Sequence, residues 1–263
     1  TGGTQFSPRV AVNWLPAPGH AFRLGYARAA SALNLFANHT DVRLTRSGQL
    51  LDQIELSLNP IKPEEIRSQE LGYLFTDPER HLNLGTRVFR NRLSDIVTGG
   101  TVPYANDPVT GDGLVRTFRN TVSASQRGLE YQLTWQPEAH RWIRLAQSWV
   151  ERDADNARNY VRSIPRTTLS LQAASRIGST DLSLGYYRVS DMLWISGDRD
   201  RLSHYNRLDL RLARSWKTAS GDLEAALVLQ SPLGKEFESF DGDLYKAQVF
   251  LRQGYVSVRY DFR

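Results

Sequence analysis

The chain has 263 residues, enough for one large domain or two small ones. With 40% hydrophobic and 23% charged residues it has the composition of a folded protein. Because it has no cysteine, a disulfide framework, a thiolate zinc site and a thiol nucleophile are all excluded. The net charge is +5, yet the arginines stand singly between apolar residues, which argues against a nucleic-acid partner.

The N-terminal residues Thr-Gly-Gly-Thr contain neither an initiator methionine nor the basic and apolar regions of a signal peptide. No apolar run approaches the roughly 18 residues of a transmembrane helix. We therefore expect a mature chain or a fragment.

Strict alternation of apolar and polar residues dominates the sequence, which is typical of strands whose two faces meet different environments. Eleven segments show it: Val10–Trp14, Phe22–Tyr26, Leu71–Phe75, Leu82–Val88, Leu129–Trp135, Ile143–Leu145, Leu169–Ala173, Leu182–Tyr186, Leu208–Leu212, Leu223–Leu229 and Val256–Phe262. The polar positions carry many charges. Both a soluble sandwich and a membrane barrel with a polar lumen alternate in this way.

The connections between these segments favour the barrel. Short turns fall at Pro16–His20, Thr76–His81, Gln136–Arg141, Arg176–Thr180 and Lys217–Gly221. Between them lie longer polar connections, over residues 31–63, 98–117, 153–163, 195–204 and 232–246. Short turns on one side and long loops on the other are typical of an outer-membrane barrel.

Tryptophan placement points the same way. Trp14, Trp135, Trp142 and Trp216 flank short turns, where a barrel carries a girdle of aromatic side chains at the membrane interface. The alternative is that these are core tryptophans of a sandwich. In the barrel, we expect one set of residues to face lipid: Leu129, Leu133, Leu184, Leu210, Leu227 and Val258. We expect a second set to line the lumen: Glu130, Arg144, Arg207, Asp209, Arg211 and Glu224.

Five short motifs resemble the C-terminal barrel of TonB-dependent outer-membrane receptors. Residues Asn59, Pro60, Ile61, Lys62, Pro63 and Glu64 resemble the family's N-P-x-L-K-P-E segment, with Ile61 in place of the usual Leu. An E-x-G strand start follows at Glu70. Arg127-Gly128-Leu129-Glu130 resembles R-G-x-E, and Ile164-Pro165 resembles the opening of a later strand. Tyr255–Phe262 resembles the terminal strand.

The resemblance implies an all-β fold, a transmembrane antiparallel β-barrel of 22 strands with an N-terminal plug. Because about eleven strands are predicted and single-chain bacterial barrels have even numbers, we expect residues 1–263 to be the C-terminal half, without the plug. Arg9–Trp14 and Tyr255–Phe262 should then be edges that do not pair with each other, unless a further strand lies within residues 40–58.

The implied function is TonB-dependent uptake of a scarce ligand, such as an iron-siderophore, across the bacterial outer membrane. The implied partners are membrane lipid and lipopolysaccharide, the small-molecule ligand, and the TonB complex through the missing N-terminal part. Loop residues able to grip an anionic or aromatic chelate are Tyr104, Tyr160, Arg162, Trp194, Arg199, Phe237 and Phe240. Each also fits ordinary loop packing or lipopolysaccharide contact.

Two other functions remain open, a passive porin or export barrel and an outer-membrane hydrolase. No H-E-x-x-H, G-x-S-x-G or P-loop motif occurs, so we expect no enzyme and no cofactor. Asp198, Asp200, Asp241 and Asp243 lack the spacing of a calcium loop, so no metal site is predicted.

Overall fold

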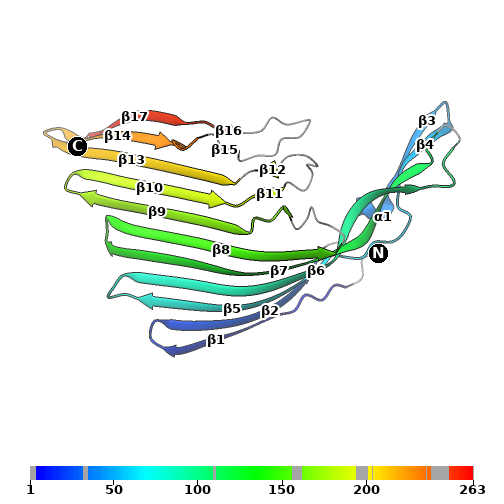
Figure 1. Ribbon diagram of the computed structural model, residues 1–263, viewed down its shortest axis with the longest axis horizontal. Coiled ribbons are helices and arrows are strands. Elements are labelled where there is room, and N and C mark those ends of the chain that lie inside the picture. The colour runs from blue at the N-terminus through cyan, green and yellow to red at the C-terminus, as the bar shows by residue number, and fades with distance from the viewer. Residues whose placement is uncertain are drawn as a thin grey trace.

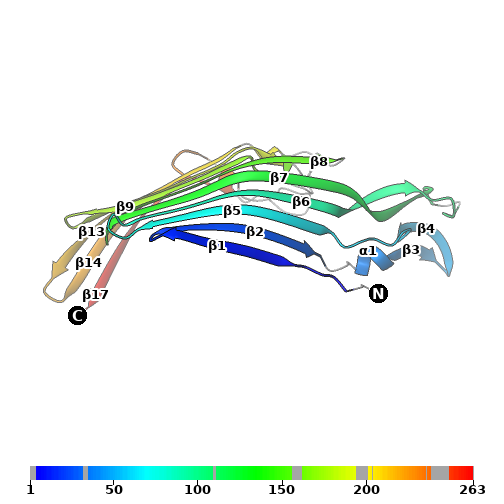
Figure 2. The ribbon, with the colours of Figure 1, turned by 90° about the horizontal axis from the view of Figure 1, so that it is seen from below.

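The computed structural model describes residues 4–31, 35–108, 111–155, 162–193, 201–202, 204–234, 236–237 and 249–262. A single curved sheet dominates (Figures 1 and 2). Its main path runs through eleven strands in sequence order, each antiparallel to the next. They are β1 (Arg9–Ala17), β2 (His20–Ala30), β5 (Glu65–Asp77), β6 (Leu82–Pro103), β7 (Leu114–Glu138), β8 (Arg141–Asp155), β9 (Thr167–Ile177), β10 (Thr180–Val189), β13 (Tyr205–Thr218), β14 (Gly221–Gln230) and β17 (Gln253–Phe262). Each predicted segment lies within one of these strands, so the all-β prediction is confirmed.

The remaining elements are small. Helix α1 (Leu35–His39) precedes the hairpin of β3 (Asp41–Arg46) and β4 (Gln49–Leu56), and β4 joins β7 through one parallel pair, Glu55 with Arg116. Strand β11 (Met192–Leu193) pairs with β12 (Arg201–Leu202), and β15 (Glu236–Phe237) pairs with β16 (Val249–Phe250).

The five predicted short turns all lie at one end of the sheet, on the left of Figure 1. Gly19 shows how closely two of these turns approach each other. Its backbone has φ +77°, and a Cβ there would collide with the carbonyl oxygen of Thr76. The Thr76 N–H in turn donates to the Gly19 carbonyl at 2.8 Å, which fastens the first turn to the second.

The opposite end holds the long connections, but the predicted loop over 98–117 is wrong in extent. Strands β6 and β7 continue through most of it and leave only residues 104–113 as the connection. At ~3.3 Å per residue, β6 is roughly 70 Å long, whereas a membrane-spanning strand needs only about ten residues. A bulge between Leu93 and Ile96, where Asp95 has φ 57°, lets the pairing continue, so this end projects as a lobe with β3 and β4 (Figure 1).

The register sorts the side chains onto two faces. Through successive partners, Gly72, Arg87, Glu130 and Ser148 share one face, which we call the polar face. Leu71, Val88, Leu129 and Trp149 share the other, which we call the apolar face. The six residues predicted for the lumen all fall on the polar face, and the six predicted for lipid all fall on the apolar face.

The exposed fractions of the side chains are the reverse of those expected for a soluble sheet, because the apolar face is the more exposed one. On the apolar face, Leu24 is 63% exposed and Val258 is 69% exposed. On the polar face, the side chain of Glu224 is only 18% exposed and Ala213 is buried. Side chains crowd together on the concave side of a curved sheet and spread apart on the convex side. The apolar face is therefore the outward one, and it is suited to hydrocarbon rather than water.

The aromatic girdle needs one correction. Trp14, Trp135 and Trp216 lie on the apolar face near the short turns, as predicted, and Trp14 stacks on Phe22 with centroids 5.3 Å apart. Trp142 lies on the polar face, because its strand partner is Ala174. Its parity differs from that of Ile143, and a single residue of offset moves a side chain to the other face.

The two ends of the path, β1 and β17, are open edges. Among the described residues no ladder joins β1 to β17, and β3 and β4 do not enter the path between them. The prediction that these edges do not pair with each other is confirmed.

Phe89 and Gly128 lie opposite each other on the polar face. Phe89 is only 7% exposed, and its ring occupies the space that a side chain at residue 128 would take. A Cβ on Gly128 would come within 2.8–2.9 Å of that ring and would collide with the Trp149 carbonyl. The glycine of the R-G-x-E motif is therefore required by packing.

We expect Leu210→Arg to destabilise the protein in lipid vesicles by roughly 2–4 kcal/mol, if residue 210 lies near the bilayer midplane. Urea unfolding in vesicles measures this change. Ser183→Arg, on the polar face of the neighbouring strand, is the control and should shift the midpoint far less. Equal shifts would mean that the faces are reversed.

We expect Gly128→Val to destabilise the sheet by about 1–3 kcal/mol, since the new side chain must displace Phe89 or widen the β7–β8 pairing. Gly100→Ala, where a Cβ meets nothing within 4 Å, is the matched control. The same unfolding measurement compares them, and no difference between the two variants would contradict the packing role of Gly128.

Candidate functional site

A ladder of alternating charges crosses four strands of the polar face. Arg23 of β2 pairs with Glu70 of β5 at 3.3 Å, and Glu70 contacts Arg87 of β6 at 3.4 Å. Arg87 also donates to Glu130 of β7 at 2.7 Å. Each charge in the ladder has a partner of opposite sign, so its side chains are held in place. Together they form a polar surface that suits contact with another polar domain.

A second charged group occupies β13 and β14. Arg207 pairs with Asp209 at 2.9 Å, and Arg211 donates to Glu224 at 2.6 Å. These four residues and Glu130 are five of the six predicted for the lumen. The sixth, Arg144, lies on the same face with its guanidinium 5.9 Å from the ring centre of Trp142.

A broad hollow of about 1100 Å³ extends over the sheet from β1 to β10. Its lining includes polar-face residues of the ladder and of β8, β9 and β10: Arg23, Arg87, Glu130, Ser148, Ser170 and Tyr187. Hydroxyl, carboxylate and guanidinium groups line a space large enough for part of another domain or for a small molecule.

The N-P-x-L-K-P-E-like segment has a structural role at the loop end. The Lys62 N–H donates to the Asn120 Oδ1 at 2.7 Å, and the Asn120 amide donates back to the Lys62 carbonyl at 3.0 Å. Glu64 accepts a hydrogen bond from the Val97 N–H at 2.8 Å, and Ile61 is buried. The motif therefore fastens the end of a long connection to the β6 bulge, and Asn120, which sequence reasoning missed, is its partner.

The lobe has a small polar core. Gln53 and Glu55 are both buried, and the Thr40 hydroxyl donates to Glu55 at 2.8 Å. On its surface, hydrogen bonds from Arg43 and then Gln53 hold the pKa of Asp41 below its usual range. These contacts give the projecting hairpin a defined shape.

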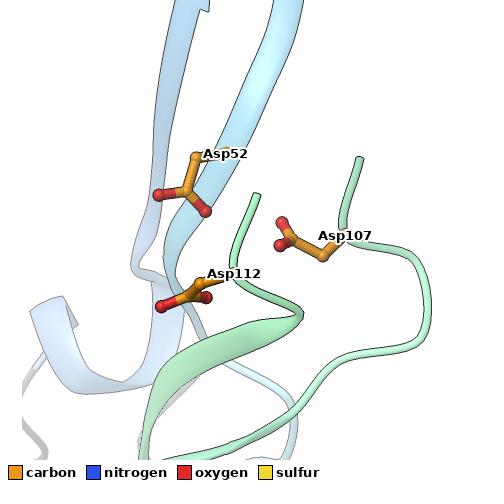
Figure 3. A group of neighbouring side chains, drawn as sticks. All are labelled: Asp52, Asp107 and Asp112. Carbon is orange, nitrogen blue, oxygen red and sulfur yellow. The ribbon is translucent and has the colours of Figure 1, made fainter. Parts of the chain in front are cut away.

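Three carboxylates meet at the tip of the lobe (Figure 3). Asp52 of β4 and Asp107 and Asp112 of the β6–β7 connection place oxygens within 4.8 Å of one another. Asp107 accepts hydrogen bonds from the backbone N–H groups of Gln53 and Gly113, at 3.0 and 2.8 Å. Calcium takes six to eight oxygen ligands, so three carboxylates alone do not define a calcium site. The cluster does tie the connection to β4.

The predicted ligand-gripping residues are only partly described. Tyr104 begins the β6–β7 connection, where its N–H donates to the Gly113 carbonyl at 2.9 Å, and Arg162 is exposed shortly before β9. Phe237 lies in β15, a short strand whose side chains are not described. Tyr160, Trp194, Arg199 and Phe240, and the acidic residues Asp198, Asp200, Asp241 and Asp243, lie outside the described residues. Tyr104 is on the projecting lobe, so it is not brought to the ends of β8 and β9, where Arg162 lies (Figure 1).

A cluster of arginines at the loop end was missed. Arg152 lies on the polar face near the end of β8, and the charges of Arg166 and Arg162 both act on it. One terminal nitrogen of Arg152 is buried without a hydrogen-bond partner among the described residues. Arg152 occupies a polar-face position in the alternation of β8, and this pattern could have identified it from the sequence. Three cations and a free donor make this an attractive place for an anion.

Among the described residues, no helix is long and apolar enough to cross a membrane. The model of the family of TonB-dependent receptor-like β-barrels matches residues 1–228. A search of curated proteins finds no match.

Solved structures of similar fold include several receptors. The pyoverdine receptor FpvA of Pseudomonas aeruginosa PAO1 matches with TM-score 0.71 and 14% identity, over 98% of this chain and 36% of that one. A mutant of the ferric enterobactin receptor PfeA of P. aeruginosa matches with TM-score 0.64 and 18% identity, over 96% and 39%. The ferric-catecholate import receptor Fiu of E. coli K12 matches with TM-score 0.66 and 13% identity, over 95% and 34%.

The chain belongs to the family of TonB-dependent receptor β-barrels, as its motifs predicted. Such barrels are bacterial outer-membrane proteins, so the chain is placed in that membrane. It spans only about a third to two fifths of the length of the structures that it matches.

We expect cysteines at neighbouring positions 129 and 130 to differ in reactivity, because their side chains lie on opposite faces. In cells, Glu130→Cys should react with a small hydrophilic thiol reagent, and Leu129→Cys should react only with a lipid-soluble one. Labelling followed by mass spectrometry measures both. The opposite preference would mean that the polar face does not line the lumen.

Proposed function

We propose that the protein is a TonB-dependent receptor that actively takes up a scarce ligand, such as an iron-siderophore, across the outer membrane. The observation that carries this proposal is the ladder from Arg23 to Glu130, which lies over a large hollow on the inward face. Family membership supports it. The matched receptors, which bind pyoverdine or import ferric catecholates, illustrate the ligand class.

We infer that the polar face lines the lumen and meets a plug domain supplied by the N-terminal part of the whole protein. The charges on β2, β5, β6 and β7 and those on β13 and β14 would find partners on that plug. The TonB complex would act through the same N-terminal part. On this proposal residues 1–263 form the C-terminal portion of the barrel.

The ligand would be held at the loop end. The arginine cluster Arg152, Arg162 and Arg166 supports an anionic ligand, because planar guanidinium groups suit carboxylate and catecholate oxygens. The remaining candidates are the aromatic and basic loop residues predicted from sequence: Tyr104, Tyr160, Trp194, Arg199, Phe237 and Phe240.

A passive porin, an export barrel and a hydrolase are the alternatives, and no observation favours any of them. The matches are to transport receptors rather than enzymes, and transport without catalysis is the function that we propose.

Uptake of labelled ferric chelates by iron-starved cells tests the proposal. Deletion of the gene should abolish uptake of one chelate, and loss of TonB or of the proton gradient should do the same. Uptake that persists without TonB would indicate a passive pore.

Arg152→Gln should weaken chelate binding by about tenfold, since a charged hydrogen bond to the ligand is lost. Arg214→Gln, near the short turns, is the matched control.

A further inference from the structure

A cluster of five arginines lies on the apolar face toward the loop end. We call it the arginine belt: Arg28, Arg67, Arg90, Arg92 and Arg127. The register sets Arg28, Arg67 and Arg92 side by side on β2, β5 and β6, and it sets Arg90 opposite Arg127 on β6 and β7. Like charges directly across a sheet are destabilising. Such a row is stable only with counter-charges nearby.

Ion pairs within the described residues reach three of these five arginines. Glu65 pairs with both Arg28 and Arg67 at 2.5 Å, and Glu151 pairs with Arg127 at 2.5 Å. Asp153 and Asp155 also lie on this face at the loop end of β8, so among the described residues five arginines meet four acids. Arg90 and Arg92 are exposed and form no ion pair with any residue that the structure describes.

The belt borders a row of exposed apolar side chains. Leu24, Leu71, Val88, Leu129 and Trp149 stand side by side on the same five strands. Residues two positions further along each strand are only ~7 Å away, and there the belt begins. The cations therefore lie where the apolar surface ends, on the side of the long connections, which is extracellular in outer-membrane barrels.

A hollow of about 600 Å³ joins these two zones. The side chains of Val10, Val12, Leu24 and Val88 line its apolar part, and Arg90 and Arg127 line its margin. The hollow is thus amphipathic. Apolar side chains line one part of it, and the guanidinium groups of Arg90 and Arg127 lie at its margin.

We propose that the arginine belt and this hollow bind a phosphorylated lipid of the outer leaflet. Its phosphate contacts Arg90 and Arg92, and one acyl chain lies along Val10, Val12 and Leu24. Guanidinium groups donate paired hydrogen bonds to phosphate, which supplies the missing negative charge. A free anion would leave the apolar part of the hollow empty, and a soluble protein cannot reach side chains at the depth of the acyl chains.

The test uses the full-length receptor in mild detergent and native mass spectrometry with diphosphoryl lipid A as the probe. We expect the wild type to retain the lipid and Arg90→Gln/Arg92→Gln to retain about tenfold less, because two charged donors are lost. Dephosphorylated lipid A should bind both proteins equally weakly. Arg214→Gln, an outward arginine near the short turns, should bind like the wild type.

Three results would overturn the proposal. They are equal retention by the double variant, equal binding of the dephosphorylated lipid to the wild type, and displacement of the lipid by inorganic phosphate at low millimolar concentration. Arg92→Lys keeps the charge and should retain most of the lipid, which guards against a folding defect in the double variant. Chelate uptake by the double variant should be normal, so failure here is separate from failure of the proposed function.

Discussion

Backbone hydrogen bonding between neighbouring strands is the constraint on which this structure depends. In hydrocarbon an unpaired N–H or C=O group costs several kcal/mol, so every strand must find a partner on both sides. Strands β2 through β14 of the main path meet this requirement within the described chain, and β1 and β17 meet it on one side only. On the proposed function, further strands of the barrel would pair with these two open edges.

The curvature of the sheet then decides which side chains fit on each of its two faces. The inward face crowds its residues, so it uses small ones such as Ala213 and Ala226, and it pairs charges such as Arg211 and Glu224 with each other. Phe89 fits there only because Gly128 opposite lacks a side chain. The outward face spreads its leucines and valines apart, which leaves them exposed to lipid.

The two ends of the strands serve different purposes. At the short-turn end the chain reverses tightly, and aromatic side chains lie near the membrane interface. At the other end β6 and β7 continue far beyond the length needed to span a membrane, and the family motif with Asn120 holds the first long connection against them. The motif thus fixes the position of that connection relative to the β6 bulge.

Local alternation was enough to predict all eleven strands and the face of every residue assigned to lumen or lipid, because the period of two is a property of the strand alone. The expected position of Trp142 was wrong because it rested on the closeness of this residue to a turn rather than on its parity in the strand. Register, the bulge at Asp95 and the extension of β6 and β7 depend on partners far away in the chain. The Lys62–Asn120 clamp joins residues 58 positions apart, and the arginine belt gathers residues from four strands. Such groupings arise only when the strands align, so the tertiary structure alone decided them.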